Sequence, residues 1–168
     1  MEDQATTPEH PSPFSRLAEG LDYPVYIVTT AVDAEHSGCL IGFATQCSIH
    51  PPRFLACISK KNHTFALVQR ASVLAVHVVE AKDKALADLF GGQTGDQVDK
   101  FSDVSWHEEF GVPILDACQR WFAGKVEKHV DFGDHLGLVL TPLAQETQVT
   151  DEQLRFQSAK HIKPGHAP

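Results

Sequence analysis

The sequence has no long apolar run and little positive charge. No hydrophobic stretch in its 168 residues approaches the roughly 20 residues that a membrane-spanning helix needs. Fourteen Lys and Arg against 22 Asp and Glu give a formal net charge of -8, which opposes sequence-independent binding to nucleic acid or to an anionic membrane. Residues 1–13 are polar and proline-rich, unlike a secretory signal. We therefore expect a cytoplasmic protein with neither nucleic acid nor membrane as its partner.

The four cysteines and ten histidines lack the spacing of a metal site. The cysteines show no close pairing of the kind found in zinc sites, and three of them lie in apolar, strand-like stretches; they are Cys39, Cys47, Cys57 and Cys118. Buried reduced thiols are favoured over a disulfide or a metal role. No two histidines are four residues apart, so no helical metal-binding pair is present and we predict no metal.

Two common nucleotide-binding fingerprints are also missing. The sequence contains neither GxGxxG after its first strand-like run nor GxxxxGK[ST]. If a nucleotide binds, it does so on a fold other than the familiar dinucleotide-binding and P-loop folds.

The composition is that of one folded domain. Hydrophobic residues make up 42% and charged residues 21%, and the length suits a single core. We expect residues 1–13 to be a disordered arm and residues 14–168 to form a single domain.

Strand-like segments dominate the folded part. β-branched and aromatic runs or alternating patterns predict strands over residues 23–32, 39–45, 53–59, 72–79, 118–130 and 135–149, with a turn over 33–38. Helical patterns cover 14–20, 64–70 and 82–90, and residues 95–113 have no period and are predicted to be an extended excursion. This pattern favours a mainly β fold, a closed Greek-key barrel with a few short helices.

Residues 38–52 form the first of three clusters that carry a functional signal. A strand leaves its ladder there and enters a loop fixed by Pro51 and Pro52. Such a loop offers backbone N–H groups and hydroxyls to the polar edge of a flat ring. A plain turn, with Ser48 bonding its own backbone, explains the same residues.

The second cluster, residues 59–64, lies between a strand and the start of a helix. It contains Ser59, Lys60, Lys61, Asn62, His63 and Thr64. Two cations at a helix N-terminus can cradle a phosphate, because both favour negative charge. Surface lysines beside a solvated helix cap are the alternative.

The third cluster is Gly133-Asp134-His135, at the start of the last long strand. An imidazole beside a carboxylate can orient a substrate amide or relay a proton. A simple hairpin corner accounts for the same three residues.

Taken together, the clusters resemble the flavin reductase-like FMN-binding split-barrel family over about residues 23–142. The stretch from Gly38 to Ser48 with the following prolines resembles the family's flavin-facing loop, residues 59–64 resemble its phosphate-contacting turn, and Gly133-Asp134-His135 resembles its GDH motif. Leu40, Gly42 and Phe43 stand where family members often carry polar residues. The resemblance implies a split-barrel homodimer that reduces FMN, or FAD, with NADH or NADPH.

The resemblance also implies roles for individual residues. Those lining the isoalloxazine would be Thr45, Gln46, Cys47 and Ser48, and those around the ribityl phosphate would be Ser59, Lys61, Asn62, His63 and Thr64. His135 would lie near the nicotinamide as the catalytic residue. Many relatives pass reduced flavin to a separate monooxygenase, which implies a possible partner of that kind.

Two other functions fit the same residues. The domain would be a non-catalytic flavin carrier if it bound flavin without oxidising a nicotinamide. It would be an FMN-dependent reductase of another small acceptor if the flavin served as a prosthetic group.

Overall fold

The computed structural model describes residues 12–95, 97–148 and 152–165. Its strands are β1 (Tyr26–Val32), β2 (Glu35–Ile41), β3 (Ala44–Ser48), β4 (Arg53–Ser59), β5 (Val73–Val78), β6 (Trp106–Glu109), β7 (Val112–Leu115), β8 (Arg120–Asp131) and β9 (His135–Thr147). Its helices are α1 (Pro13–Ala18), α2 (Phe65–Val68), α3 (Lys84–Gly92), α4 (Phe156–Ala159) and the 3-10 turn η1 (Lys100–Ser102). The predicted arm lies outside the described residues except for its last two, and α1 begins within it. None of the helices described is long and apolar enough to cross a membrane.

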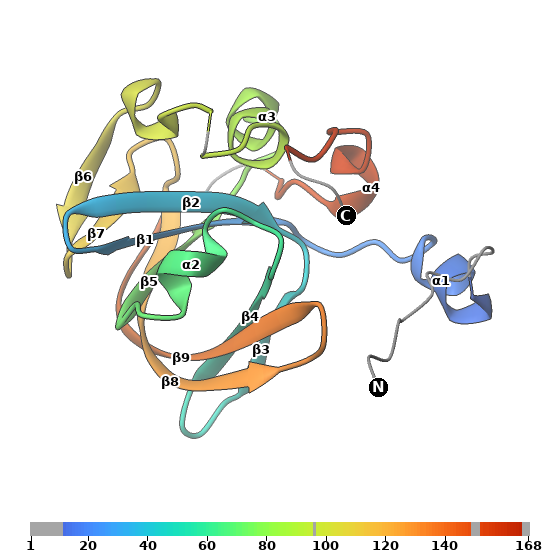
Figure 1. Ribbon diagram of the computed structural model, residues 1–168, viewed down its shortest axis with the longest axis horizontal. Helices are drawn as coiled ribbons and strands as arrows, with labels where there is room; N and C mark the ends of the chain where they lie inside the picture. Colours follow the sequence, from blue (N-terminus) through green and yellow to red (C-terminus); the bar gives the residue numbers. More distant parts are fainter. Residues whose placement is uncertain (1–11, 96, 149–151, 166–168) are drawn as a thin grey trace, which may run out of the picture.

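Seven strands form one antiparallel sheet in the order β2-β1-β5-β8-β9-β4-β3, and β6 pairs with β7 in a separate hairpin. The predicted mainly β fold with a few short helices is confirmed. The sheet curls around an interior, but in the described residues no ladder joins its two end strands, β2 and β3 (Figure 1). Only Gly42 and Phe43 separate β2 from β3, but β3 pairs with β4 at the other end of the sheet.

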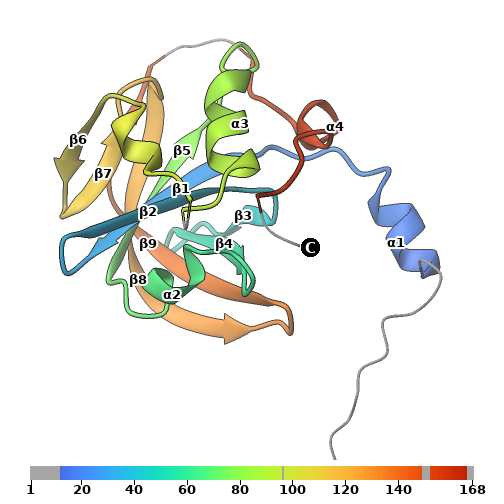
Figure 2. The ribbon, with the colours of Figure 1, turned by 45° about the horizontal axis from the view of Figure 1, so that its top comes forward.

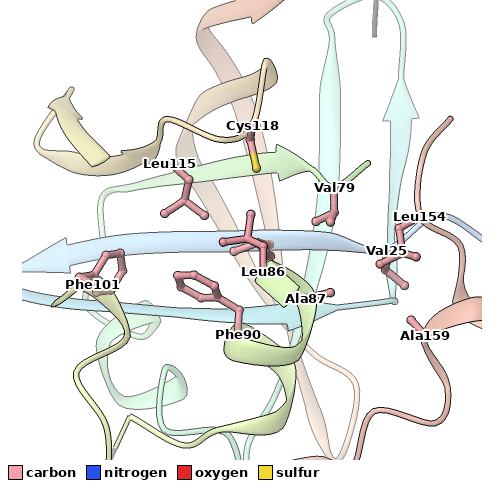
Figure 3. Packing of buried hydrophobic residues seen from close by; sticks show 11 residues of the cluster. Val25, Val79, Leu86, Ala87, Phe90, Phe101, Leu115, Cys118, Leu154 and Ala159 are labelled. Atoms are coloured by element: carbon pink, nitrogen blue, oxygen red, sulfur yellow. The ribbon is translucent and has the colours of Figure 1, made fainter. Parts of the chain in front are cut away.

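Strand β1 is buried on both faces, which explains why its sequence lacks a polar face; its two threonines, Thr29 and Thr30, are buried and donate to backbone carbonyl oxygens. Val28 packs into the interior of the curled sheet, whereas Ile27 belongs to a second cluster on the outer face. That second cluster lies between β1 and α3 and includes Phe90, Leu115 and Leu154 (Figure 3). Because two cores share one strand, they are held in a fixed relation to each other.

The helices lie on opposite sides of the β1–β2 hairpin. Figure 1 shows α3 and α4 on one side and α2 on the other. The buried α2 residue Val68 packs into the interior cluster, so the helix covers the curled sheet there. Helix α1 stands apart from the rest in both ribbon views, and Phe14 and Leu17 are largely exposed on it (Figure 2).

The turn between β1 and β2 is shorter than the predicted span of residues 33–38. Asp33 and Ala34 make the turn alone, with φ of 52° and 65°. Two successive positive φ angles are the geometry of a type I′ hairpin turn, which glycine or asparagine usually supplies. Gly38, which suggested the longer turn, lies inside β2, where a Cβ would be 2.9 Å from the Val28 carbonyl oxygen.

Two predicted irregular segments contain strands. The predicted strand over residues 39–45 is interrupted at residues 42–43, and residues 46–48, interpreted as a loop, belong with Ala44 and Thr45 to the edge strand β3, which pairs with β4. Residues 95–113, interpreted as an extended excursion, contain η1, β6 and the start of β7. The β6–β7 hairpin has no clear period because β7 is fully buried whereas β6 is largely exposed.

The long β8–β9 hairpin confirms the alternation predicted for residues 118–130 and 135–149, although Val149 lies outside the described residues. Phe122 faces the interior cluster, while Trp121 and Ala123 pack under β7 on the other face. The first half of β8 is therefore covered on both faces, and only its second half has a solvated face.

His77 on β5 joins the sheet to the β6–β7 hairpin. Its Nδ1 lies 3.0 Å from the Ile27 carbonyl oxygen, and its Nε2 accepts the Leu115 N–H at 3.1 Å. Nδ1 must donate and Nε2 must accept, so these contacts require the neutral imidazole. Complete burial lowers the pKa of His77 to about 4.

This burial predicts a loss of stability in mild acid. Between pH 6.5 and about 4 the unfolded chain binds a proton that native His77 excludes, so the unfolding free energy falls as pH falls through this window. The full loss is about 3 kcal/mol, since each pKa unit corresponds to about 1.4 kcal/mol. Urea unfolding at pH 8, 6 and 5 measures the part of this loss that is reached by pH 5, about 2 kcal/mol. His77→Gln should be less stable at pH 8 and should show a smaller loss in this window; an unchanged loss would rule out His77 as its source.

Candidate functional site

A groove of about 630 Å³ opens where segments distant in the sequence meet. They are residues 23–25, the end of β2 with the turn after it, β4 with its following turn, α3, the β8–β9 corner and the C-terminal residues. The lining consists of Tyr23, Val25, Leu40, Ile41, Gly42, Phe43, Cys57, Ser59, Lys61, Asn62, Phe90, Gly91, Asp134, His135, Phe156, Ala159, Lys160, Ile162 and Pro164. Most of these residues are apolar. The lining has two lysines, Lys61 and Lys160, and one carboxylate, Asp134.

The ladder between β4 and β9 brings two of the sequence clusters together. Ser59, the last residue of β4, pairs with His135, the first of β9. The Lys60 backbone N–H donates to the Asp134 carbonyl oxygen at 2.9 Å. The Lys60 ammonium donates to both carboxylate oxygens of Asp131, at 2.8 and 2.9 Å, and this bond lowers the pKa of Asp131. The turn after β4 and the β8–β9 corner therefore form one continuous edge of the groove.

The turn after β4 divides its residues between two sides. Lys61 and Asn62 line the groove, whereas His63 lines a separate hollow of about 560 Å³. Thr64 is buried, and its hydroxyl lies 2.9 Å from that of Ser37. The side-chain oxygen of Asn62 accepts the Thr64 N–H at 3.0 Å, which fixes the turn.

Aromatic rings form one wall of the groove. The rings of Phe156 and Tyr23 stack with centroids 4.7 Å apart, Tyr23 lies 6.2 Å from Phe43, and Phe43 lies 5.1 Å from His135. A Cβ on Gly42 would lie 2.8 Å from the Tyr23 ring, so glycine permits this packing. Phe43 remains 55% exposed, and the wall therefore offers an open aromatic surface.

The β8–β9 corner orients the ring of His135. Its Nδ1 lies 2.8 Å from a carboxylate oxygen of Asp134, and this hydrogen bond lowers the pKa of Asp134. An ionised carboxylate only accepts, so Nδ1 carries the proton and Nε2 is left to exchange one. Gly133 makes the corner with φ of 103°, a conformation that favours glycine.

Cys57 is the cysteine in the groove. It lies half-buried on β4, and burial raises the pKa of its thiol. A neutral thiol is a poor nucleophile at physiological pH. The groove therefore offers ring surfaces and cations rather than a reactive thiolate.

The last described residues, 156–165, form a further wall that we call the C-terminal strap. It lines the groove with Phe156, Ala159, Lys160, Ile162 and Pro164. Its end is fixed to α3, because the Gly165 N–H donates to the Gly91 carbonyl oxygen at 3.2 Å. Its start follows Arg155, whose Nε donates to the Asp22 carboxylate at 2.9 Å.

The structure divides the predicted site residues. Those that line the groove are Ser59, Lys61, Asn62 and His135, whereas His63 and Thr64 face away from it. The four predicted ring contacts, Thr45, Gln46, Cys47 and Ser48, lie on the edge strand β3 and are outside the groove lining of the described chain.

Sequence reasoning missed the aromatic wall and the strap. The apolar residues at 40–43, noted only as a departure from a family pattern, were the available signal for Phe43. Nothing comparable marks Tyr23, Phe156 or the strap, because their place in the groove depends on packing between the two ends of the chain.

The sequence matches a known protein family and named relatives. Residues 18–157 match the family described as flavin reductase like domain. The chain is 30% identical over 139 residues to the FMN reductase (NADH) RutF of Bradyrhizobium diazoefficiens, covering 82% of this chain and 77% of the relative. It is 31% identical over 116 residues to the flavin-dependent monooxygenase reductase subunit HsaB of Rhodococcus jostii, covering 66% of this chain but only 56% of the relative.

The fold also has close counterparts among solved structures. The NADH:FAD oxidoreductase SgcE6 of Streptomyces globisporus C-1027 superposes with a TM-score of 0.79 at 23% identity, covering 87% of this chain and 88% of that one. At this identity the likeness supports the fold.

Proposed function

Since the chain belongs to the flavin reductase-like domain family, we propose that it is a flavin-binding oxidoreductase that passes hydride from NADH or NADPH to FMN, with FAD as an alternative flavin. The observation that carries this proposal is the meeting of Lys61, Phe43 and His135 in one groove. A cation, an open aromatic surface and an imidazole suit a phosphate-bearing ring system beside a nicotinamide.

The residues of the groove fit a flavin. Phe43 and Tyr23 offer ring surface to a flat aromatic ligand. Lys61, with the Ser59 hydroxyl and the Asn62 amide, provides donors for a phosphate at the end of β4. Helix α2 has a single turn, so we assign the favourable charge to Lys61 rather than to a helix dipole. The groove volume is typical of ligand sites.

The residues of β3 remain predicted ring contacts. Phe43 directly precedes β3, and its carbonyl oxygen accepts the Cys57 N–H at 2.9 Å, which continues the pairing with β4. By the two-residue period of a strand, Thr45 would then share the face of Phe43. We propose that Thr45 meets the ring edge first, with Gln46, Cys47 and Ser48 further along β3. His63 and Thr64 support the phosphate turn from behind.

The protein's part in the reaction is chiefly positioning. The flavin, when bound, supplies the hydride-accepting chemistry. Holding two rings in reacting geometry lowers a barrier by about 7–11 kcal/mol, which exceeds what one proton-transferring side chain contributes. Phe43 and Tyr23 keep water from the ring face, and His135, oriented by Asp134, holds or moves a proton at Nε2.

We further propose that residues 14–168 act as one domain and that its sheet is a closed Greek-key split barrel. Side chains would close the gap that hydrogen bonds leave between β2 and β3. Cys39 and Ile41 of β2 support this, since they pack in one cluster with Ala56 and Ile58 of β4.

A homodimer is supported by an exposed apolar face next to the groove. Phe132 is 56% exposed, and its ring lies over Gly137 beside Leu55, on the same part of the sheet as the edge strand β3. Unprotected edge strands and apolar sheet faces favour association. We propose that a second copy covers this face and narrows the open side of the groove.

The partner and the compartment follow from the chemistry proposed. HsaB is named as the reductase subunit of a monooxygenase, which supports delivery of reduced flavin from this chain to a monooxygenase. All four cysteines, which lie in described parts of the chain, are free thiols, as is usual in the reducing cytoplasm. We therefore propose a cytoplasmic location.

The central test is an assay of the purified protein. Its colour, and its oxidation of NADH and NADPH with FMN, FAD or riboflavin added, are measured together. The proposal expects flavin binding and nicotinamide oxidation. Binding without oxidation would indicate a carrier, and reduction of a quinone but not of added flavin would indicate a reductase of another acceptor.

Lys61→Ala should weaken FMN binding about tenfold, because it removes a charge-assisted hydrogen bond to the phosphate. Quenching of flavin fluorescence measures the dissociation constant. Riboflavin, which has no phosphate, should bind the variant and the wild type equally. Lys125→Ala removes the same charge from an exposed position on β8 and should change neither the FMN nor the riboflavin dissociation constant. Equal FMN affinities for Lys61→Ala and the wild type would exclude the phosphate contact.

His135→Ala should slow turnover about tenfold without abolishing it, less than the 10²–10⁴ typical of an essential acid or base. The reason is that positioning by the aromatic wall persists. Steady-state oxidation of NADH with FMN is the measurement. His129→Ala, on β8 outside the groove lining, is the matched control and should turn over normally. Unaltered kinetics in His135→Ala would remove this residue from the mechanism.

Phe132→Ser should convert the homodimer to a monomer, because it removes an exposed ring from the proposed interface. Light scattering on a sizing column reports the mass. Phe110→Ser is the control, since Phe110 is similarly exposed, at 52%, but lies on the β6–β7 turn. A monomeric wild type, or a dimer lost equally in both variants, would contradict the assignment of this face.

A further inference from the structure

The groove has cations on two different walls of an acidic chain. Lys61 follows β4, whereas Lys160 belongs to the C-terminal strap. Asp134 is the carboxylate in the lining, and it is hydrogen-bonded to His135. In a chain of net charge -8 this balance favours anionic ligands, and it provides two separate places for phosphate.

Lys160 is held in position by a chain of hydrogen bonds. Its ammonium donates to the Gln157 side-chain oxygen at 2.7 Å. The Gln157 side-chain nitrogen donates in turn to the carbonyl oxygens of Glu19 and Leu21, at 2.8 and 2.7 Å. An ammonium has three donors, so the contact with Gln157 orients Lys160 and leaves capacity for phosphate oxygens.

The aromatic wall runs between the two proposed ends of the site. It starts at His135, continues through Phe43 and Tyr23, and ends at Phe156 on the strap, four residues before Lys160. A nicotinamide at His135 would stack on the flavin ring that Phe43 and Tyr23 support, and the rest of its dinucleotide would extend past the flavin toward Phe156 at the far end of the wall. Its pyrophosphate would then reach the strap, while the flavin phosphate occupies the turn after β4.

Most of the strap lies beyond the part of the chain that matches the family. The family match ends at residue 157, yet Ala159, Lys160, Ile162 and Pro164 line the groove beyond that point. The part of the groove that the family pattern covers contains Lys61 and His135, and the part beyond it contains Lys160. A residue outside the shared pattern is a natural place for specificity toward one substrate.

We propose that Lys160 binds the pyrophosphate of the reduced nicotinamide dinucleotide and thereby sets the affinity for the reductant independently of the flavin. This inference rests on the proposed function. It gives the groove two anion sites with separate roles, Lys61 for the flavin and Lys160 for the nicotinamide.

The test is Lys160→Ala in the full chain loaded with FMN. The KM for NADH and for NADPH should rise about tenfold with little change in kcat, because a ground-state contact is removed. The dissociation constant of NAD⁺ or NADP⁺, measured by titration calorimetry without turnover, should rise by the same factor. The dissociation constant of FMN should not change.

A truncated reductant isolates the pyrophosphate. 1-Benzyl-1,4-dihydronicotinamide carries no phosphate, so wild type and Lys160→Ala should oxidise it equally. Lys160→Arg should restore most of the affinity for the dinucleotide. Lys163→Ala removes a charge from the same strap outside the groove lining and should behave as the wild type.

Three results would overturn the inference while leaving the proposed function standing. They are an unchanged KM and NAD(P)⁺ affinity in Lys160→Ala, a loss of FMN affinity like that of Lys61→Ala, or an equal loss with the phosphate-free reductant. A wild type that neither binds flavin nor oxidises nicotinamide would instead end both proposals.

Discussion

The ladder between β4 and β9 determines where the groove lies and which side chains reach it. The ladder sets Ser59 opposite His135. Beyond this pair, the Lys60 N–H donates to the Asp134 carbonyl oxygen and extends the pairing by one residue. A slip of one residue would turn every side chain of β4 to the opposite face. The slip is opposed by Ala56, Ile58, Leu138 and Leu140, which alternate with the groove residues and are completely buried.

The same ladder separates two neighbouring lysines that look equivalent in the sequence. Lys60 binds Asp131 across the corner, so its charge is used within the fold. Lys61 turns into the groove. An exposed ion pair such as that of Lys60 adds little stability on its own, and its main effect here is to fix the corner that carries His135. The acidic chain thus keeps a local positive site without a basic surface.

Much of the fold could be predicted because most strands have strong local patterns. The runs at residues 53–59 and 72–79 and the alternation in β8 and β9 correspond closely to observed strands. The β1–β2 turn was predicted too long, since Asp33 and Ala34 adopt positive φ without glycine. The β6–β7 hairpin gave no period, because β7 is buried on both faces, whereas in β6 Trp106 packs on the core cluster and His107 and Glu108 are exposed.

The site was predictable only where one short segment carries several polar residues. The turn after β4 and the Gly133-Asp134-His135 corner met this condition, and they supply four groove residues. His63 and Thr64 belong to the same segment but point elsewhere, because a turn sends successive side chains in different directions. The strap has no local signal, since its place in the groove depends on contacts with distant residues: Gly91, the residues around Asp22 and the core cluster that includes Ala159.

The groove edge formed by β4 and β9 and the C-terminal strap differ in how well they tolerate substitution. The edge formed by β4 and β9 is part of the interior packing, so a substitution there disturbs the core as well as the ligand. The strap is held by side-chain bonds to residues 19–22 and by one backbone bond to α3, and it lies at the end of the described chain. Ala159, Phe156 and Ile162 pack with the core cluster, but Lys160 is exposed, so substitutions at this position can alter the groove at small cost to the fold. If Lys61 binds the flavin and Lys160 the reductant, as proposed, the flavin end would be constrained by the core, whereas the affinity for the reductant could be tuned from the strap.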